Sequence, residues 1–363
     1  MYLRCLILLY LFNTFSGFQL SDSTRFFHVE GIEPYVHYSE YHERIFFVQR
    51  KGNHSYLKST DKESRVQSHG IVRTHGQNDI SLNNYHISIG ETQALIKAES
   101  ALRPESNKLV FISLEDFYNQ NDHNERVFQA PFIRNGLYHL VNDSLLYTIQ
   151  RADSIYMSRT MLFEGDLSQM IESYPSFSHN ENPAWANSVE NQLLKYKMKA
   201  VSDSDGNTCA VFRFSSWLLC SRNDGQELFA TDQPDKVQFP NVEPTRIRGT
   251  NFQTSPTSSE HRVQSIDIAM DDVFVYLLVF GKDIDTRSLI LNAFRSRQQV
   301  DSEKITSISE RVYLYEKETG RFLKEITLPN PATAITVDGN HLIVVEDNEE
   351  KGIRWYPKSD WDL

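Results

Sequence analysis

Two acidic segments contain the residue types that hold divalent cations, and their spacing decides what each can do. Asp203-Ser204-Asp205-Gly206-Asn207 has the alternating carboxylates of a calcium loop. An EF-hand loop places glycine sixth and glutamate twelfth, whereas here glycine is fourth and Phe214 is twelfth. Asp271-Asp272 stands directly before a strongly apolar stretch. Both segments are predicted to be polar turns, and the identity of any metal ligand stays unknown.

Residues for catalysis are not grouped in any familiar motif. The sequence has no G-x-S-x-G elbow, H-E-x-x-H helix, phosphate-binding loop or G-x-G-x-x-G. His69 and His75 lie six residues apart in a polar stretch and are predicted to be loop histidines. We therefore predict no catalytic residue and no cofactor. The alternative is a central calcium ion held by acidic and amide side chains that only the fold brings together.

Cysteine usage points to an oxidising compartment. Cys5 lies in the N-terminal leader, which leaves Cys209 and Cys220 as the pair in the rest of the chain. They fall in two successive strand-like segments, and neighbouring antiparallel strands bring Cα atoms to the roughly 5.5 Å that a disulfide needs. We predict one disulfide, with two buried free thiols as the alternative. Asn53 and Asn142 each begin an N-x-[ST] sequon and are predicted glycosylation sites on turns.

The N-terminus has the pattern of a secretory signal peptide. Arg4 precedes an apolar run over residues 5–12, and the small residues Thr14 and Ser16 follow it. A membrane span needs about 20 apolar residues, so this run is too short. We predict a signal peptide over 1–16 and a secreted, extracellular domain over 17–363 without a membrane span. The alternative is a buried N-terminal helix.

Charge and composition limit the class of partner. The 363 residues include 37 Lys and Arg against 48 Asp and Glu, a formal charge of -11. Phosphate binding requires a basic surface, so nucleic acid is excluded as the main partner. The 40% of hydrophobic residues is enough to build a core.

Strand-like segments dominate the chain. They are short, rich in β-branched and aromatic residues, and bounded by polar turns; the clearest are residues 45–48, 109–112, 145–149, 273–280 and 342–345. Two short helices are predicted, over residues 168–173 and 185–199.

A hairpin pattern recurs along the chain. An apolar strand, a short polar turn and a mixed second strand appear in four segments; they are residues 44–60, 145–160, 217–231 and 341–359. Counting further centres near residues 90 and 276, the repeat averages about 60 residues, somewhat longer than the roughly 40–50 of propeller blades, and predicts six units.

Each unit has about four antiparallel strands, and such a small sheet cannot bury both faces alone. Radial stacking buries them and leaves only short edges. Tyr313–Lys317, the turn Glu318-Thr319-Gly320 and the strand up to Leu328 resemble a β-propeller blade. Phe26, Phe27 and Val29 are expected to supply a strand that closes the ring with the C-terminal unit. We predict an all-β fold with a single propeller of about six four-stranded blades; the alternative is a pair of β-sandwich domains.

This resemblance implies a function carried by loops on a rigid ring. The first prediction is an extracellular binding protein for a protein, a glycan or a small ligand. A calcium-dependent propeller hydrolase, similar to lactonases or esterases, is the alternative. A non-catalytic accessory protein is the second alternative.

Overall fold

The computed structural model describes most residues between Arg25 and Trp361. The residues that it does not describe are 1–24, 53, 62–65, 68–71, 75–80, 100–107, 120–125, 130–136, 143–144, 152–154, 164–165, 178–197, 214, 225, 238–244, 247–252, 255–263, 281–307, 348–350 and 362–363. The predicted signal peptide, His69, His75 and Asn53 therefore lie outside the described residues. Residues 185–197 of the second predicted helix also lie outside them, and its last two residues belong to a strand.

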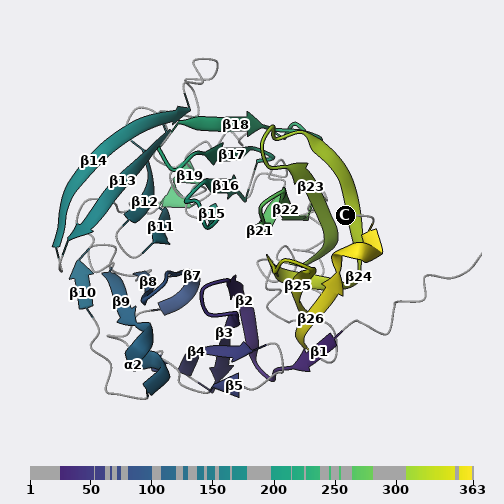
Figure 1. Cartoon of the computed structure of the whole chain (residues 1–363), viewed down its shortest axis with the longest axis horizontal. Helices are drawn as coiled ribbons and strands as arrows, with labels where there is room; N and C mark the ends of the chain where they lie inside the picture. The colour runs from purple at the N-terminus through teal and green to yellow at the C-terminus, as the bar shows by residue number, and fades with distance from the viewer. Residues whose placement is uncertain are drawn as a thin grey trace, which may run out of the picture.

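The fold is built from β-strands, which confirms the all-β prediction (Figure 1). All five of the clearest predicted segments are strands; they are β3 (Arg44–Lys51), β9 (Lys108–Ser113), β12 (Leu145–Arg151), β22 (Phe274–Val279) and β25 (His341–Glu346). Each strand pairs with neighbours in an antiparallel meander.

Three sheets are simple four-stranded meanders. The first consists of β7 (Ser81–Ile89), β8 (Gln93–Glu99), β9 and β10 (Arg126–Gln129). The second consists of β11 (Leu137–Asn142), β12, β13 (Ile155–Phe163) and β14 (Asp166–Phe177). The third consists of β15 (Met198–Ser202), β16 (Thr208–Phe212), β17 (Leu218–Ser221) and β18 (Glu227–Thr231).

The remaining sheets carry the two ends of the chain. One follows the order β2 (Ile32–Ser39), β3, β4 (His54–Asp61) and β5 (Val66–Gln67), and β6 (Val72–Thr74) also pairs with β4. A seven-stranded sheet joins β21 (Ser265–Met270), β22, β23 (Ser309–Glu316), β24 (Phe322–Val337), β25, β26 (Gly352–Pro357) and β1 (Arg25–His28). The 16-residue β24 serves both halves of that sheet. A short pair, β19 (Thr245–Arg246) and β20 (Gln253–Thr254), stands apart.

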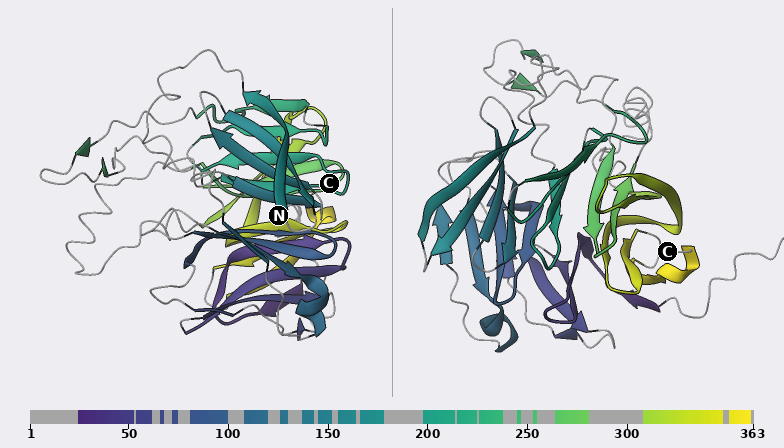
Figure 2. Two further views of the ribbon diagram at one scale, coloured as in Figure 1. Left: turned by 90° about the vertical axis from the view of Figure 1, so that its left-hand side faces the viewer. Right: turned by 45° about the horizontal axis from the view of Figure 1, so that its top comes forward.

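These sheets stand side by side around a common centre instead of forming layered sandwiches (Figures 1 and 2). The strands that line the centre are β2, β7, β11, β15, β21 and the last part of β24. Each of these strands contacts the next one around the centre, and β24 contacts β2, so the contacts close into a ring. Since each unit is a meander, all the inner strands run in the same direction, and their C-terminal ends meet on one face.

The core lies between the faces of neighbouring sheets, as radial stacking requires. Phe46 of β3 packs with Ala94, Val110 and other residues of the next sheet. Cys209 and Cys220 pack against β21, β22 and β23. The ring is therefore held mainly by apolar contacts between sheets that are far apart in sequence.

The first and last strands of the chain close the ring, as predicted from Phe26 and Phe27. β1 pairs antiparallel with β26, with Phe27 opposite Ile353. Gly352 lies where the two strands approach most closely, because a Cβ there would stand 2.4 Å from the carbonyl oxygen of Phe27. The absence of a side chain at residue 352 is what lets β1 pair here.

Three local features differ from the sequence-based expectations. Residues 168–173 are not a helix; they belong to β14, which pairs with β13 along its length. A short helix that was not predicted, α2 (Leu114–Asn119), follows β9 and buries Leu114 and Phe117. The hairpin over residues 217–231 is real, but it contains the two outer strands of its sheet, whereas the other three repeats contain the two middle strands.

Among the described residues, no helix has the length and apolarity needed to cross a membrane.

Candidate functional site

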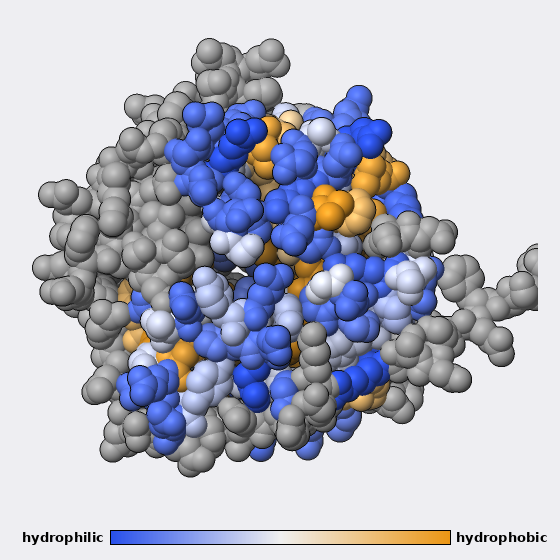
Figure 3. All heavy atoms as spheres, in the orientation of Figure 1, coloured by the Kyte–Doolittle hydropathy of each residue, from blue (hydrophilic) through white to orange (hydrophobic). Residues whose placement is uncertain are grey.

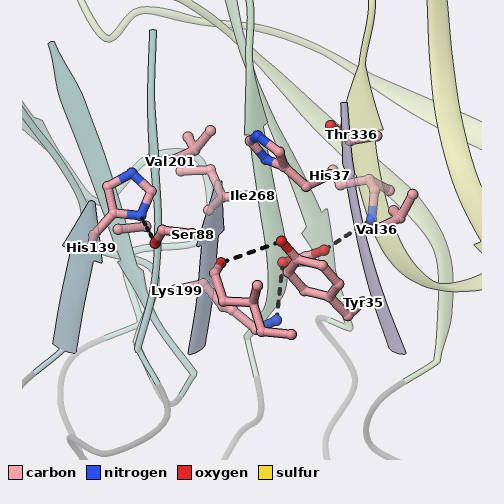
Figure 4. Close-up of a pocket in the computed structure, with 13 residues that line it drawn as sticks. Tyr35, Val36, His37, Ser88, His139, Lys199, Val201, Ile268 and Thr336 are labelled. Atoms are coloured by element: carbon pink, nitrogen blue, oxygen red, sulfur yellow. Dashed lines mark hydrogen bonds and ion pairs between the residues drawn. The ribbon is translucent and has the colours of Figure 1, made fainter. Parts of the chain in front are cut away.

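The centre of the ring is a narrow polar channel. A cavity of about 50 Å³ is lined by residues from β2, β7, β11, β15, β21 and β24 (Figure 4). We call this region the channel. Its polar side chains are Tyr35, His37, Ser88, His139, Lys199, Asp267 and Thr336. One element from every part of the ring thus contributes to a single site.

Polar contacts join successive inner strands around the channel. Tyr35 donates to the carbonyl of Ile87 at 3.4 Å, and Thr336 Oγ1 accepts from the Tyr38 N–H at 3.0 Å. Ser88 Oγ and His139 Nδ1 are 3.0 Å apart. These contacts link β2 to β7, β24 to β2 and β7 to β11.

The deep part of the channel is organised by Asp267. Its carboxylate accepts from the Ile335 N–H at 2.9 Å and lies 3.4 Å from the ammonium of Lys199. Burial raises the pKa of Asp267, while Lys199 and the backbone donor act in the opposite direction. Burial, together with the nearby Asp267 charge, also raises the pKa of Tyr35. This layer is therefore a satisfied polar network that fixes the positions of three inner strands.

The upper part of the channel contains two imidazoles. Figure 4 shows His37 and His139 on the side away from Tyr35 and Lys199. Burial lowers the pKa of His37 to about 4, with a contribution from His42, and lowers the pKa of His139 to about 3, with a contribution from His37. Both rings are neutral at pH 7, so each can donate or accept a hydrogen bond without charge.

His139 has one nitrogen in use and one facing open space. The residue is 9% exposed, and its Nδ1 is held by Ser88. No described residue forms a hydrogen bond with Nε2. A hydroxyl–imidazole pair is also the beginning of a nucleophile and base, but no described carboxylate orients His139. The pair is therefore suited to holding a ligand rather than to activating a nucleophile.

Above the imidazoles the channel opens into a wide cavity. Its volume is about 720 Å³, and it is lined by the C-terminal ends of the inner strands and by the turns that follow them. We call it the mouth cavity. Figure 3 shows this face of the molecule, where the described residues around the centre are mostly hydrophilic. The lining contains seven carboxylate residues and no described Lys or Arg; they are Glu40, Glu91, Asp203, Asp205, Asp224, Asp271 and Asp272.

Asp203 and Asp271, both suggested by the sequence, hold turns in place. Asp203 accepts from the Asn207 N–H at 2.8 Å and pairs with Lys317 at 2.6 Å. Asp271 accepts from the N–H groups of Val273 and Phe274 and pairs with Lys358 at 2.6 Å. The predicted polar turns are therefore correct.

Each ion pair also connects one unit of the ring to the next. Lys317 directly follows β23, and Lys358 directly follows β26, the third strand of the last unit. In both cases the lysine after the third strand reaches back to the inner-strand turn of the preceding unit. The shape of the mouth cavity thus depends on contacts between units.

The described residues contain no group of three or more His, Cys, Asp and Glu that could hold a metal ion. Any role for calcium stays a prediction.

The structure joins Cys209 and Cys220 as the sequence predicts. They are register partners in β16 and β17, and their Cα atoms are 4.1 Å apart. Asn142 is the last residue of β11, and β12 begins at Leu145. Glycosylation of Asn53 and Asn142 stays a prediction.

Removing the disulfide is expected to destabilise the protein. The cysteines are 11 residues apart, and closing so short a loop lowers the free energy of the folded state relative to the unfolded chain by about 2–3 kcal/mol. Urea unfolding of the Cys209→Ala/Cys220→Ala variant measures this loss, and mass spectrometry of the unreduced wild type verifies the bond. Two free thiols in the purified wild type, or unchanged stability in the variant, would contradict the prediction.

The channel residues were not found from the sequence. His37, His139 and Asp267 each stand between apolar residues of a different strand, and no local motif connects them. The sequence signal for these residues was a polar side chain between apolar neighbours of a strand. Such a side chain needs a hydrogen-bond partner or a function when the strand is buried.

Comparisons with known proteins identify no family for this chain. No family model and no curated protein matches the chain. Solved structures similar to 92% of this chain include the Cps50 (Swd1) β-propeller domain of Myceliophteria thermophila (10% identity, TM-score 0.42, 98% of that chain). They also include a streptogramin B lyase (12%, 0.45, 96%) and a virginiamycin B lyase from Staphylococcus aureus (10%, 0.47, 98%).

These neighbours are β-propeller proteins. At such identities and TM-scores they imply nothing about ligand or activity. The function has to be argued from the channel and the mouth cavity of this chain.

Proposed function

We propose that this protein is a secreted binding protein, built as a single six-bladed propeller over residues 17–363. Its mouth cavity would take a cationic group of a ligand. The six inner strands, their closed set of contacts and the pairing of β1 with β26 support the blade count. The signal-peptide pattern of residues 1–16 supports secretion.

The observation that carries the proposal is His139 in its acidic setting. A neutral imidazole is held by Ser88 and directs its other nitrogen into open space, below a cavity rich in carboxylates. A cation entering this cavity gains favourable electrostatic energy from the carboxylates. The imidazole then supplies a hydrogen bond that fixes the position of the ligand.

Two small probes of equal shape test the proposal. N-acetyl-lysine N-methylamide carries an ammonium group, and its norleucine analogue does not. Calorimetry with the secreted protein is expected to detect binding of the lysine compound only. His139→Asn retains a hydrogen-bonding atom near Ser88 but removes the free Nε2, and is expected to weaken binding about tenfold, the loss for one hydrogen bond of about 1.4 kcal/mol.

Equal binding of the two probes, or no binding of either, would contradict the proposal. A lysine compound that binds the wild type and His139→Asn equally would also contradict it.

A further inference from the structure

The described residues include two large hydrophobic side chains that are mostly exposed, and both lie on the same face of the ring. Tyr41 is 68% exposed, lies on the turn between β2 and β3, and lines the mouth cavity. Val273 is 57% exposed and follows Asp272 on the turn between β21 and β22. Because β21, β24 and β2 are successive inner strands, only the turn after β24 separates these two positions around the rim. Their exposure is therefore concentrated beside the mouth cavity.

Six of the seven carboxylates of the same rim fall into two groups, and the seventh, Asp224, accepts from the Gln226 N–H at 2.9 Å. Asp203 and Asp271 are neutralised by Lys317 and Lys358 and hold turns. The second group is exposed and forms no ion pair with any described residue; it comprises Glu40, Glu91, Asp205 and Asp272. This second group is dispensable for the turns and remains available to a partner.

We propose that this rim docks a basic segment of another extracellular protein. The inference rests on the proposed function, since one Lys or Arg of the segment would enter the mouth cavity toward His139. Further basic side chains would pair with Glu40 and Asp272. Apolar side chains of the segment would cover Tyr41 and Val273, which lie next to those two carboxylates in the sequence.

Size and charge favour a peptide segment over other ligands. Cavities of about 300–1,000 Å³ accommodate ligands larger than one side chain, and the mouth cavity falls within that range. The exposed carboxylates repel phosphate and anionic membrane surfaces. A small amine would leave both apolar side chains uncovered, whereas an interface normally combines apolar anchors with a charged rim.

Fluorescence anisotropy with a labelled twelve-residue peptide of Lys and Leu tests the proposal. Control peptides carry Glu in place of Lys, or Ser in place of Leu. The wild-type protein is expected to bind the first peptide, and to bind it more weakly as salt is added. Both control peptides are expected to bind at least about tenfold more weakly.

Two matched protein variants locate the site. Glu40→Gln/Asp272→Asn removes two charges from the rim, and Glu30→Gln/Glu310→Gln removes two exposed charges that adjoin the opposite ends of the strands. Only the first of these two variants is expected to bind the Lys–Leu peptide about tenfold more weakly than the wild type does. Tyr41→Ser/Val273→Ser changes side chains that are exposed, so this variant should fold normally. It is expected to bind the peptide more weakly than the wild type does, by a similar factor.

The outcomes separate the two proposals. If the lysine compound binds in a His139-dependent way but the rim variants bind the peptide normally, the docking proposal is overturned and the proposed function stands. If the peptide binds equally well with Ser in place of Leu, docking is also overturned. If neither the lysine compound nor the peptide binds, both proposals fail.

Discussion

Replacing Lys317 by methionine is expected to lower the free energy of unfolding by about 3–5 kcal/mol, because the substitution leaves a buried carboxylate without its cation. The side chains of Lys317 and Asp203 are 5% and 3% exposed, and their charged atoms are 2.6 Å apart. Methionine has nearly the length of the lysine stem, so packing changes little. The measured loss would therefore report mainly the unpaired charge of Asp203.

A matched control is available on the same hairpin. Arg321 pairs with Glu316 at 3.3 Å, but their side chains are 68% and 35% exposed. Water screens this pair, so Arg321→Met is expected to leave the free energy of unfolding nearly unchanged. Urea titrations of both variants make the comparison.

The double variant Asp203→Asn/Lys317→Met distinguishes charge from packing. Asparagine retains an oxygen for the Asn207 N–H while removing the buried charge. Much of the stability lost in Lys317→Met should return. If Lys317→Met costs less than about 1 kcal/mol, the pair does not hold the turn after β15, and the link between the two units must lie elsewhere.

Hairpins were predictable from sequence because their information is local. The strand–turn–strand pattern of residues 341–359 needs only its own alternation and turn, and β25 pairs with β26 as expected. The closing strand was also predictable, since Phe26 and Phe27 form an unpartnered apolar segment at the start of the domain. The cysteine register followed from two adjacent strands.

The position of a hairpin within its unit was less predictable. Residues 217–231 have the same local pattern as the other repeats but lie one strand further from the centre. The local pattern of a hairpin is the same at every distance from the axis of the ring. The position of this hairpin within its sheet therefore could not be predicted from its own sequence. The helix α2 does have a local sequence signal, since Ser113 stands directly before it as an N-cap residue. In the structure, Ser113 accepts from the Asp116 N–H at 3.3 Å.

The candidate site was not predictable, because its residues meet only when the ring closes. Tyr35 and Thr336 stand in the first and last inner strands, about 300 residues apart. Each contributes one side chain, so no spacing within a segment describes the channel. A site of this kind is a property of the closed ring and of the common direction of its inner strands.

Acidification from pH 7 to pH 5 is expected to lower the free energy of unfolding by about 4 kcal/mol through His37 and His139. Their folded pKa values of about 4 and 3 lie below the usual 6.5 of the unfolded chain. Between those values the unfolded state binds protons that the native state does not, so stability rises with pH and falls as the solution is acidified. Each histidine contributes about 2 kcal/mol over these two pH units.

Neighbouring groups modify this profile in a known direction. Burial raises the pKa of Asp267, so that its native carboxyl retains a proton more readily than in the unfolded chain and opposes the trend as pH falls. A comparison of variants removes this background. The variant His37→Asn/His139→Asn retains Asp267. Between pH 7 and pH 5 its free energy of unfolding should fall by about 4 kcal/mol less than that of the wild type.

Identical pH profiles for the wild type and the double variant would show that the two imidazoles titrate normally and that the channel is open to water. A flattened profile in the double variant would mean that the channel keeps both rings neutral at pH 7. That neutrality matters for the proposed ligand, because a protonated ring beneath the mouth cavity would repel a cation. Binding of the lysine compound should then weaken at acidic pH, as the imidazoles and the rim carboxylates take up protons.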